Sequence, residues 1–419
     1  MQAVKAGIRE ALFRLPAFQR CWGAYKCWQL HRDYDRRREH YHAIAGARKL
    51  AYSEAGTRDA VRKRLEARGC LPPKRLLGEI HSFAFVPQIG WHRHLLPDLH
   101  ELGPVTLFDY AEHGYRPEQF WHSAARRAAM NELVLPALRK AHAARPVDWV
   151  FSYASGLELS ASLVRRITDE LGLPTVNMCL DDKQSWAGPP VGDQRAGQID
   201  LAACFDLSWT SARVACEWYL VEGGRPLYMP EGFDASFYKP EAVERDLQVS
   251  FAGGAYGSRP AVVRYLRRHG VPIHVFGSGW GTPAEVSPAE HVRIINRSQI
   301  VLGMGEIGYS EMLTNVKGRD FEVPGTGGGV YLTSFNADLA THYTVGREIL
   351  CYRNREEMVE LIRYCLSHPD EARAIAARGR ERCLREHRWL HRYCHILAML
   401  GVFAPDAGTQ GNETASTHP

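Results

Sequence analysis

Short apolar segments alternate with longer helical stretches along most of this chain, and this alternation limits the folds that the chain can adopt. Four such apolar segments lie at 74–80, 105–110, 147–153 and 174–180. The pattern begins again at 247–252 and continues at 273–276 and 298–303. Strands that alternate with helices in this order form a parallel sheet with helices on both faces. The sequence therefore predicts an α/β fold with two Rossmann-like parallel-sheet domains in series, facing a central cleft.

The predicted domain boundaries follow from this pattern and from the length. The chain has 419 residues, more than a single domain usually holds. We predict an α-helical N-terminal extension at 1–70, an N-terminal Rossmann-like domain at 71–242 and a C-terminal one at 243–403. Residues 404–419 are polar and poor in aromatic side chains, which is typical of a disordered tail.

The extension carries most of the positive charge. Residues 1–75 hold 18 Lys or Arg and 7 Asp or Glu, whereas the net charge of the whole chain is only +5. Trp22, Tyr25 and Trp28 are interleaved with these cations. Two interpretations stay open: a helix packed on the body with a solvated basic face, or an interfacial helix attracted to anionic lipid headgroups. No nucleic-acid motif accompanies the charge, so we expect no nucleic-acid partner.

Cysteine spacing and hydropathy bear on the compartment. None of the ten cysteines has CxxC spacing, which argues against a zinc ribbon, an iron–sulfur site or a dithiol redox motif. Scattered cysteines in a chain of this length are expected to be reduced core thiols, as in the cytosol. No apolar run reaches the roughly 18–20 residues needed to span a bilayer, and no secretory signal is recognised. We expect a cytoplasmic protein, with peripheral contact on the inner face of the membrane as an option.

A series of motifs in the second half resembles a known family. The first are Tyr228–Asp234, which contains a P-x-G-h-D run, and Phe237–Pro240. Others follow at Val249–Gly254, Phe276–Trp280, Arg319–Glu322 and Gly346–Tyr352. In this order the motifs resemble the CgeB-like (spore maturation protein-type) glycosyltransferases, which are related to the retaining family 4 enzymes of the GT-B fold. The resemblance covers roughly residues 75–400.

The resemblance implies a retaining glycosyltransferase. Such an enzyme moves a sugar from a nucleotide-diphosphate donor, held by the C-terminal domain, to a cell-envelope, lipid or protein acceptor held by the N-terminal domain. The sequence lacks a convincing DxD element, so we expect transfer without a metal, and no cofactor is implied. Two alternatives stay open: a nucleotide-sugar epimerase of the same fold, and a non-catalytic nucleotide-sugar-binding protein.

Candidate phosphate-binding residues follow the first strand of the C-terminal domain. Gly253, Gly254 and Gly257 separate a strand from a helix, so their backbone N–H groups could approach phosphate. A tight turn without a ligand is the alternative, and no Gly-Lys-Ser/Thr follows as in a Walker loop. Candidate cations for the diphosphate are Arg259, Arg319 and Lys317, since a guanidinium binds phosphate oxygens in bidentate fashion.

Glu322 is the candidate for the donor ribose, because a carboxylate accepts hydrogen bonds from two vicinal hydroxyls. The resemblance places it at the second glutamate of an E-x7-E pattern, whereas the first falls on Thr314. Asn315, Glu306 and Glu311 are the open candidates to replace that first glutamate. Further backbone contacts to the donor are expected at four glycines, Gly279, Gly325, Gly327 and Gly328.

Catalytic candidates in the N-terminal domain are Asp181, Asp182 and His81. The two aspartates follow the strand predicted at 174–180, and either could hydrogen-bond the acceptor or act as a base. A turn or helix cap is an equal alternative. His81 follows the strand predicted at 74–80 and could contact donor or acceptor, and a solvated loop histidine is the alternative there.

Overall fold

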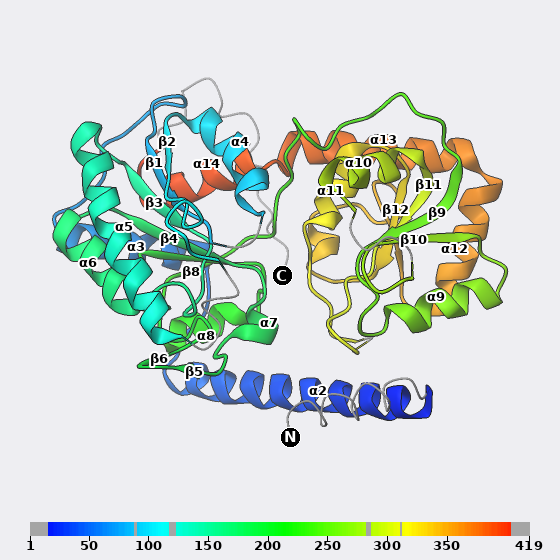
Figure 1. The fold of residues 1–419 in the computed structure, drawn as a ribbon, viewed down its shortest axis with the longest axis horizontal. Helices are drawn as coiled ribbons and strands as arrows, with labels where there is room; N and C mark the ends of the chain where they lie inside the picture. Colours follow the sequence, from blue (N-terminus) through cyan, green and yellow to red (C-terminus); the bar gives the residue numbers. More distant parts are fainter. Residues whose placement is uncertain (1–15, 88–89, 117–122, 282–285, 311, 404–419) are drawn as a thin grey trace. The chain divides into compact units, whose positions relative to one another are not determined.

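The computed structural model describes residues 16–87, 90–116, 123–281, 286–310 and 312–403. The chain forms two compact units, each built from two stretches of sequence. Unit 1 comprises Met1–His40 and Ala235–His387, and unit 2 comprises Tyr41–Asp234 and Arg388–Pro419. Each unit is described by itself, and Figure 1 labels the elements of both.

Unit 2 contains a six-stranded parallel sheet with the order β2-β1-β3-β4-β7-β8. Its strands are β1 (Ser82–Phe85), β2 (Val105–Leu107), β3 (Trp149–Ser152), β4 (Thr175–Cys179), β7 (Leu207–Thr210) and β8 (Pro226–Tyr228). A short hairpin of β5 (Pro190–Val191) and β6 (Gln194–Arg195) lies outside this sheet. The helices are α3 (Glu54–Ala67), α4 (His92–Leu102), α5 (Ala124–Ala144), α6 (Ala161–Leu171), α7 (Asp182–Ser185), α8 (Ala215–Val221) and α14 (Trp389–Leu400).

Two apolar cores hold the unit 2 helices on opposite faces of this sheet (Figure 1). Buried side chains of α3, α4 and α14 pack with one set of strand residues, which includes Trp149 and Trp209. Buried side chains of α5 and α6 pack with the alternate set, which includes Phe83 and Val150. Alternate strand residues point to opposite faces, so the four inner strands β1, β3, β4 and β7 are buried on both sides, as expected of a parallel sheet.

Unit 1 contains a five-stranded parallel sheet with the order β10-β9-β11-β12-β13. Its strands are β9 (Leu247–Ala252), β10 (Ile273–Phe276), β11 (Ser298–Leu302), β12 (Val330–Ser334) and β13 (Leu350–Tyr352). Its helices are α9 (Arg259–Arg268), α10 (Pro288–Arg297), α11 (Arg319–Thr326), the 3-10 helix η2 (Leu339–Thr341), α12 (Arg355–Ser367) and α13 (Pro369–Glu386). Buried residues of α9, α12 and α13 form one core with the strands.

The N-terminal extension is helical, as predicted. Helix α2 (Pro16–Ala47) contributes its residues up to His40 to unit 1 and its last residues to unit 2. In unit 2, Tyr41 is buried, and its hydroxyl accepts a hydrogen bond from Trp186 Nε1 at 2.8 Å. Among the described residues, no helix is both long enough and apolar enough to cross a membrane.

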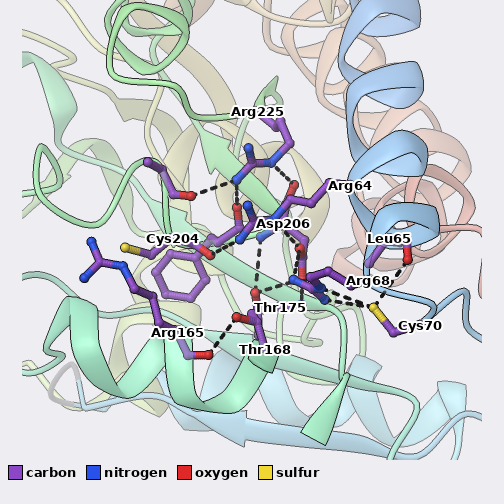
Figure 2. Close-up of polar contacts among 12 residues, drawn as sticks. Arg64, Leu65, Arg68, Cys70, Arg165, Thr168, Thr175, Cys204, Asp206 and Arg225 are labelled. Carbon is purple, nitrogen blue, oxygen red and sulfur yellow. Dashed lines mark hydrogen bonds and ion pairs between the residues drawn. The ribbon is translucent and has the colours of Figure 1, made fainter. Parts of the chain in front are cut away.

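Helix α3 is joined to the unit 2 sheet by a charged cluster centred on Asp206 (Figure 2). The Asp206 carboxylate is fully buried and accepts from Arg64 Nε at 2.8 Å and from Arg68 Nη1 at 2.7 Å. It also accepts from the backbone N–H of Thr175, the first residue of β4, at 2.9 Å. A buried carboxylate surrounded by donors in this way ties the helix to the amino ends of two strands.

The first predicted strand is wrong, because β1 begins at Ser82 rather than at residue 74. Leu76 and Leu77 are 47% and 51% exposed, so the segment does not bury the apolar side chains that suggested a strand. Gly78 has φ +90°, which belongs to a turn. The true strand is Ser82–Phe85, whose four residues are all buried.

The compact units also divide the chain differently from the predicted domain boundaries. The change between units lies at Asp234/Ala235 rather than after residue 242, and α14 belongs to unit 2 although it follows unit 1 in sequence. The reason is packing, since Tyr393, Ile396 and Leu397 of α14 are fully buried in the unit 2 core. The predicted tail at 404–419 lies outside the described residues.

Candidate functional site

The carboxyl ends of the unit 1 strands place several predicted residues at one edge of the sheet, where ligands bind in α/β folds. The loop after β9 is fixed by hydrogen bonds from Gly253 N to Phe276 O and from Ala255 N to Ser278 O, both at 2.8 Å. Gly257 has φ +61°, and a Cβ there would lie 1.8 Å from the carbonyl oxygen of Gly308. Glycine is therefore required at 257 by both conformation and space.

This loop leaves backbone donors available at the start of α9. The N–H groups of Gly253, Ala255 and Ser258 have backbone acceptors. Within the described ranges, none is found for the N–H groups of Gly254 and Gly257. The amino end of α9 follows directly and adds a partial positive charge. The loop can thus offer the amides of Gly254 and Gly257 to an anion, whereas the N–H of Gly253, the third predicted glycine, is occupied by Phe276 O.

Arg259 and Arg319 lie together against one aromatic ring. Their guanidinium carbons are 5.4 Å and 5.5 Å from the ring centroid of Phe251. The Arg259 side chain donates to Gly254 O at 3.2 Å and lies 4.0 Å from the ring centroid of Tyr256. Burial, and secondly the charge of Arg319, lower the pKa of Arg259. In the part of the chain that the structure describes, neither arginine forms an ion pair with a carboxylate, so the pair can receive an anion.

Glu306, which follows β11, supplies a carboxylate beside these arginines. Tyr352 OH donates to Glu306 Oε1 at 3.4 Å, whereas Oε2 is buried and has no hydrogen-bond partner among the described residues. Burial raises the pKa of Glu306, and the charge of Arg259 opposes this rise. The side chain lines a cavity of about 630 Å³ together with Thr314 and Ser334. A buried acceptor without a donor is costly, so Oε2 is suited to a ligand hydroxyl.

The structure brings Glu306 next to the position where the family pattern lacks its first glutamate. Glu306 and Thr314 form an isolated antiparallel β-bridge, and both line the same cavity. Asn315 is buried beside them, and its N–H donates to Gly305 O at 2.9 Å. Glu311, the other candidate, lies outside the described residues. Of the replacements left open by the sequence, Glu306 is the one whose carboxylate is seen in the cavity.

The amino end of α11 lies at the same edge and carries Lys317, Arg319 and Glu322. Asp320 fixes this turn, because it accepts from Lys317 N at 2.7 Å and from Tyr331 OH at 2.6 Å. Burial raises the pKa of Glu322 to about 7, while a hydrogen bond from Tyr238 and the charge of Arg319 act against the rise. Glu322 is thus a titratable acceptor close to Arg319, compatible with its predicted role.

The three predicted glycines at the carboxyl end of α11 lie elsewhere. Gly325, Gly327 and Gly328 precede β12, at the amino edge of the sheet, so we do not include them in the site. A Cβ on Gly328 would lie 2.5 Å from Ile295 O, and Gly327, with φ +71°, ends α11. Gly328 therefore allows close packing of this turn against α10. Gly279, by contrast, follows β10 at the carboxyl edge and lies against Ala255.

In unit 2 the two predicted aspartates have different surroundings. Asp182 is fully buried, accepts from Thr210 Oγ1 at 2.5 Å and from Tyr219 OH at 3.2 Å, and its pKa is raised to about 6 by burial. It therefore belongs to the interior. Asp181 is partly exposed after β4, and its charge contributes, after burial, to raising the pKa of Tyr153. Asp181 remains the candidate of the pair.

His81 precedes β1 rather than following a strand, which corrects the premise of its assignment. Its Nε2 is 2.9 Å from Thr106 Oγ1, and its Nδ1 is 3.2 Å from the carbonyl oxygens of Arg145 and Pro146. The side chain is buried at the amino edge of the sheet. Both ring nitrogens are thus engaged in structural hydrogen bonds, and we do not include His81 in the site.

The sequence did not single out Tyr256, Tyr352 or Glu231. The Arg259 guanidinium lies over the ring of Tyr256, and Tyr352, the last residue of β13, lies beside Glu306. Glu231 is buried after β8, and its charge also contributes to raising the pKa of Tyr153. Their position in the sequence could have identified two of them, since Tyr352 ends a strand and Tyr256 lies in the glycine-rich loop after β9. Within the described ranges, no group of three or more His, Cys, Asp or Glu side chains could hold a metal ion.

Comparison with known proteins bears on the type of domain that carries these residues. Residues 259–398 match a family model described as glycosyl transferase-like. This segment is therefore similar to glycosyl transferase-like domains. It begins at Arg259 and includes α9 through most of α14. No curated protein matches the chain.

Solved structures of other proteins are similar to this chain. A glycosyltransferase from Rickettsia africae is 9% identical, with a TM-score of 0.50 over 77% of this chain and 99% of its own. Sucrose-phosphate synthase from Thermosynechococcus elongatus is 10% identical, with a TM-score of 0.49 over 76% of this chain and 98% of its own. The structure of Anabaena HepE in complex with UDP and glucose is 11% identical, with a TM-score of 0.47 over 76% of this chain and 99% of its own. The predicted fold class, two parallel-sheet α/β domains of the GT-B type with a helical extension, is confirmed. The CgeB-like subtype stays a hypothesis.

Proposed function

We propose that this protein is a glycosyltransferase that takes a sugar from a nucleotide-diphosphate donor bound at the carboxyl edge of the unit 1 sheet. The observation that carries the proposal is the arrangement around Arg259. This buried guanidinium lies beside a second arginine, a loop with two available amides and a carboxylate oxygen without a donor. Cations next to a hydroxyl acceptor suit a ligand with both phosphates and hydroxyls.

The chemistry of transfer accounts for these residues. Departure of the sugar leaves more negative charge on the diphosphate, and fixed positive groups aimed at that charge lower the barrier. Arg259, Arg319 and the amides of Gly254 and Gly257 have this role in our proposal. Glu306 accepts hydrogen bonds from the donor sugar and Glu322 from the ribose.

The family resemblance also suggests the stereochemistry, the cofactor requirement and the acceptor of the proposed reaction. We infer transfer with retention, no metal and no cofactor, and an acceptor from the cell envelope, a lipid or a protein. The leaving diphosphate oxygen takes the acceptor proton in this scheme, with Asp181 as the acceptor-side candidate. A cytoplasmic location goes with the nucleotide-sugar donor. An epimerase and a non-catalytic nucleotide-sugar-binding protein are the alternatives to be tested.

One incubation separates these alternatives. The protein is mixed with radiolabelled UDP-, GDP- and dTDP-sugars and a cell-envelope extract, and the products are separated by size. Label in a larger product supports the transferase. An isomerised sugar without transfer would point to an epimerase, and saturable binding without turnover would point to a binding protein. The Glu306→Gln variant, which keeps the size of the side chain, is expected to bind donor more weakly and to transfer less.

Donor binding is expected to depend on pH through Glu322. Because burial raises the pKa of this carboxyl to about 7, it is protonated near pH 6 and ionised near pH 8. The ionised form accepts from both ribose hydroxyls, so affinity for the best-binding nucleotide sugar should rise between these values. Glu322→Gln should remove this rise. Titration calorimetry from pH 6 to pH 8.5 measures it, and parallel profiles for the two proteins would contradict the assignment.

The same raised pKa also affects the stability of the fold. Donor affinity is expected to rise with pH, whereas the contribution of Glu322 to stability is expected to fall with pH. The folded protein binds the proton more tightly than the unfolded chain, whose carboxyl titrates near 4.5. The contribution of Glu322 to stability is therefore present below that value and is lost as the pH rises through about 7. Thermal melts of the wild type and of Glu322→Gln should converge in acid and differ above neutrality.

We also propose peripheral contact of α2 with an anionic bilayer surface. Residues 16–32 contain three cations and no acidic residue. Tyr25 and Trp28 are 51% and 55% exposed, and the guanidinium of Arg32 lies 4.6 Å from the Trp28 ring centroid. Exposed aromatic rings next to cations are typical of helices that lie at the headgroup level.

Removing the two exposed rings tests this contact. Tyr25→Ser with Trp28→Ser is expected to weaken flotation with phosphatidylglycerol vesicles about tenfold for each ring. Leu384→Ser, at an exposed apolar position on α13, is the matched control and should float like the wild type. Binding of the wild type should fall in 0.5 M salt, because it depends on charge. Equal binding to neutral phosphatidylcholine vesicles would exclude the proposed partner.

A further inference from the structure

Unit 1 contains a second, larger cavity, which shares Gly257 of the loop after β9 with the proposed donor site but extends away from Arg259 and Glu306. It has a volume of about 1050 Å³ and lies between the first part of α2 and the loops after β9, β10 and β11. Gly23, Cys27 and His31 line it from α2 at intervals of four residues, which places them on one face of the helix. Tyr25, Trp28 and Arg32 are on the other face. The helix therefore has an inner face that forms a cavity wall.

Specific contacts hold this wall in place. His31 Nε2 is 2.8 Å from Ser310 Oγ, and the same hydroxyl accepts from the N–H of Leu313 at 2.8 Å. Gly23 lies against Tyr309, since a Cβ at position 23 would be 3.1 Å from the Tyr309 ring. A Cβ at position 23 would require the Tyr309 ring to shift by a few tenths of an ångström. The cavity is thus built by close packing of α2 on the loop after β11.

Two arginines on α9 give the cavity a positive charge. Arg264 and Arg268 are four residues apart on one face of the helix, and both line the cavity. Both are exposed, and the structure gives neither of them an ion pair or a hydrogen bond within its described ranges. Arg259 is not among the lining residues, because its guanidinium turns toward Gly254 and Phe251. The two arginines are therefore separate from those of the donor site.

The rest of the lining is mainly apolar or aromatic. Tyr256 and Met312 are 56% and 83% exposed, and Trp280 and Tyr309 border the same space. Ala24 and Cys27 complete the α2 side. Apolar surface that faces water in a concave site is typical of ligand binding. Together with the unpaired arginines, this lining suits a molecule with an anionic head and an apolar body.

We propose that this cavity binds a second ligand, an amphiphilic phosphate in which a phosphate group is attached to an isoprenyl or acyl chain. Arg264 and Arg268 hold the phosphate as bidentate donors. The inner face of α2 and the aromatic residues cover the first part of the chain. The proposal stands independently of the proposed reaction, because it concerns binding and not transfer.

Farnesyl phosphate is the probe for this cavity, and the full-length protein is used. Binding is measured by calorimetry below the micellar range, with farnesol and inorganic phosphate in parallel. We expect farnesyl phosphate to bind and each of Arg264→Ala and Arg268→Ala to weaken it about tenfold. Arg267→Ala removes the same charge from the same helix, is not in the lining, and should leave affinity unchanged. Ala24→Trp, which fills the cavity from α2, should abolish binding.

Several outcomes would overturn the proposal. If the Arg264, Arg268 and Arg267 variants all lost the same affinity for farnesyl phosphate, the effect would come from net charge alone. Farnesol binding as tightly as farnesyl phosphate would remove the role of the arginines. Displacement of farnesyl phosphate by the best-binding nucleotide diphosphate, with equal sensitivity to Arg259→Ala, would place the cavity within the donor site. Nucleotide binding that fails while farnesyl phosphate still binds would count against the proposed function and leave this inference standing.

Discussion

Replacing Asp206 by asparagine is expected to lower the free energy of unfolding of unit 2 by about 3–5 kcal/mol, the usual result of removing one partner from a buried ion pair. The carboxylate is fully buried and receives Arg64 and Arg68 from α3 (Figure 2). Arg225 lies beside them, and its pKa is lowered to about 10, first by burial and then by the charge of Arg64. Asparagine keeps the shape but leaves three guanidinium groups without a counter-charge.

Urea unfolding followed by tryptophan fluorescence measures this loss, because Trp149 and Trp209 are buried in the unit 2 core. The control is Asp246→Asn, which breaks the exposed ion pair of Asp246 with Arg297 and should change the transition little. An Asp206 variant that unfolds at the same urea concentration as the control would show that the cluster contributes no stability.

Replacing Arg259 by alanine is expected to weaken binding of the best nucleotide diphosphate about 100-fold. A hydrogen bond to a charged group contributes about 1.5–3 kcal/mol, and a bidentate guanidinium makes two of them. Arg259 is 7% exposed, so its contacts with a ligand are little weakened by solvent. Arg319 would remain and would retain part of the affinity.

Calorimetric titration with UDP, GDP and dTDP measures the effect, and thermal melts of the ligand-free proteins check folding. Arg259→Lys keeps the charge and loses the planar fork, so its affinity should lie between those of the wild type and the alanine variant. An alanine variant that folds normally and binds each nucleotide like the wild type would refute the role assigned to Arg259.

The regular part of the fold could be read from the sequence. The strands predicted at 247–252 and 273–276 coincide with β9 and β10, and the strand predicted at 174–180 contains β4. Alternation of short apolar segments with helices is a local signal, and it was sufficient here. It failed at 74–80, where adjacent leucines lie in an exposed turn and mimic a buried strand.

The site could be predicted only where local position decides it. Glycines and arginines that follow a strand were found because the carboxyl edge of a parallel sheet is predictable. The pairing of Glu306 with Thr314, the inward direction of Asp182 and the packing of α2 on Tyr309 depend on how distant segments fold back. No periodicity in one sequence encodes these contacts.

The return of α14 to unit 2 bears on how the chain folds during synthesis. Residues 41–234 leave the ribosome before Ala235–His387, yet the core around Trp149 and Trp209 is completed by Trp389 and Tyr393. Folding from the N-terminus is the usual order for successive domains. Here Ala235–His387 can finish first, while one apolar face of the earlier sheet, covered in part by α3 and α4, stays incomplete until translation reaches α14.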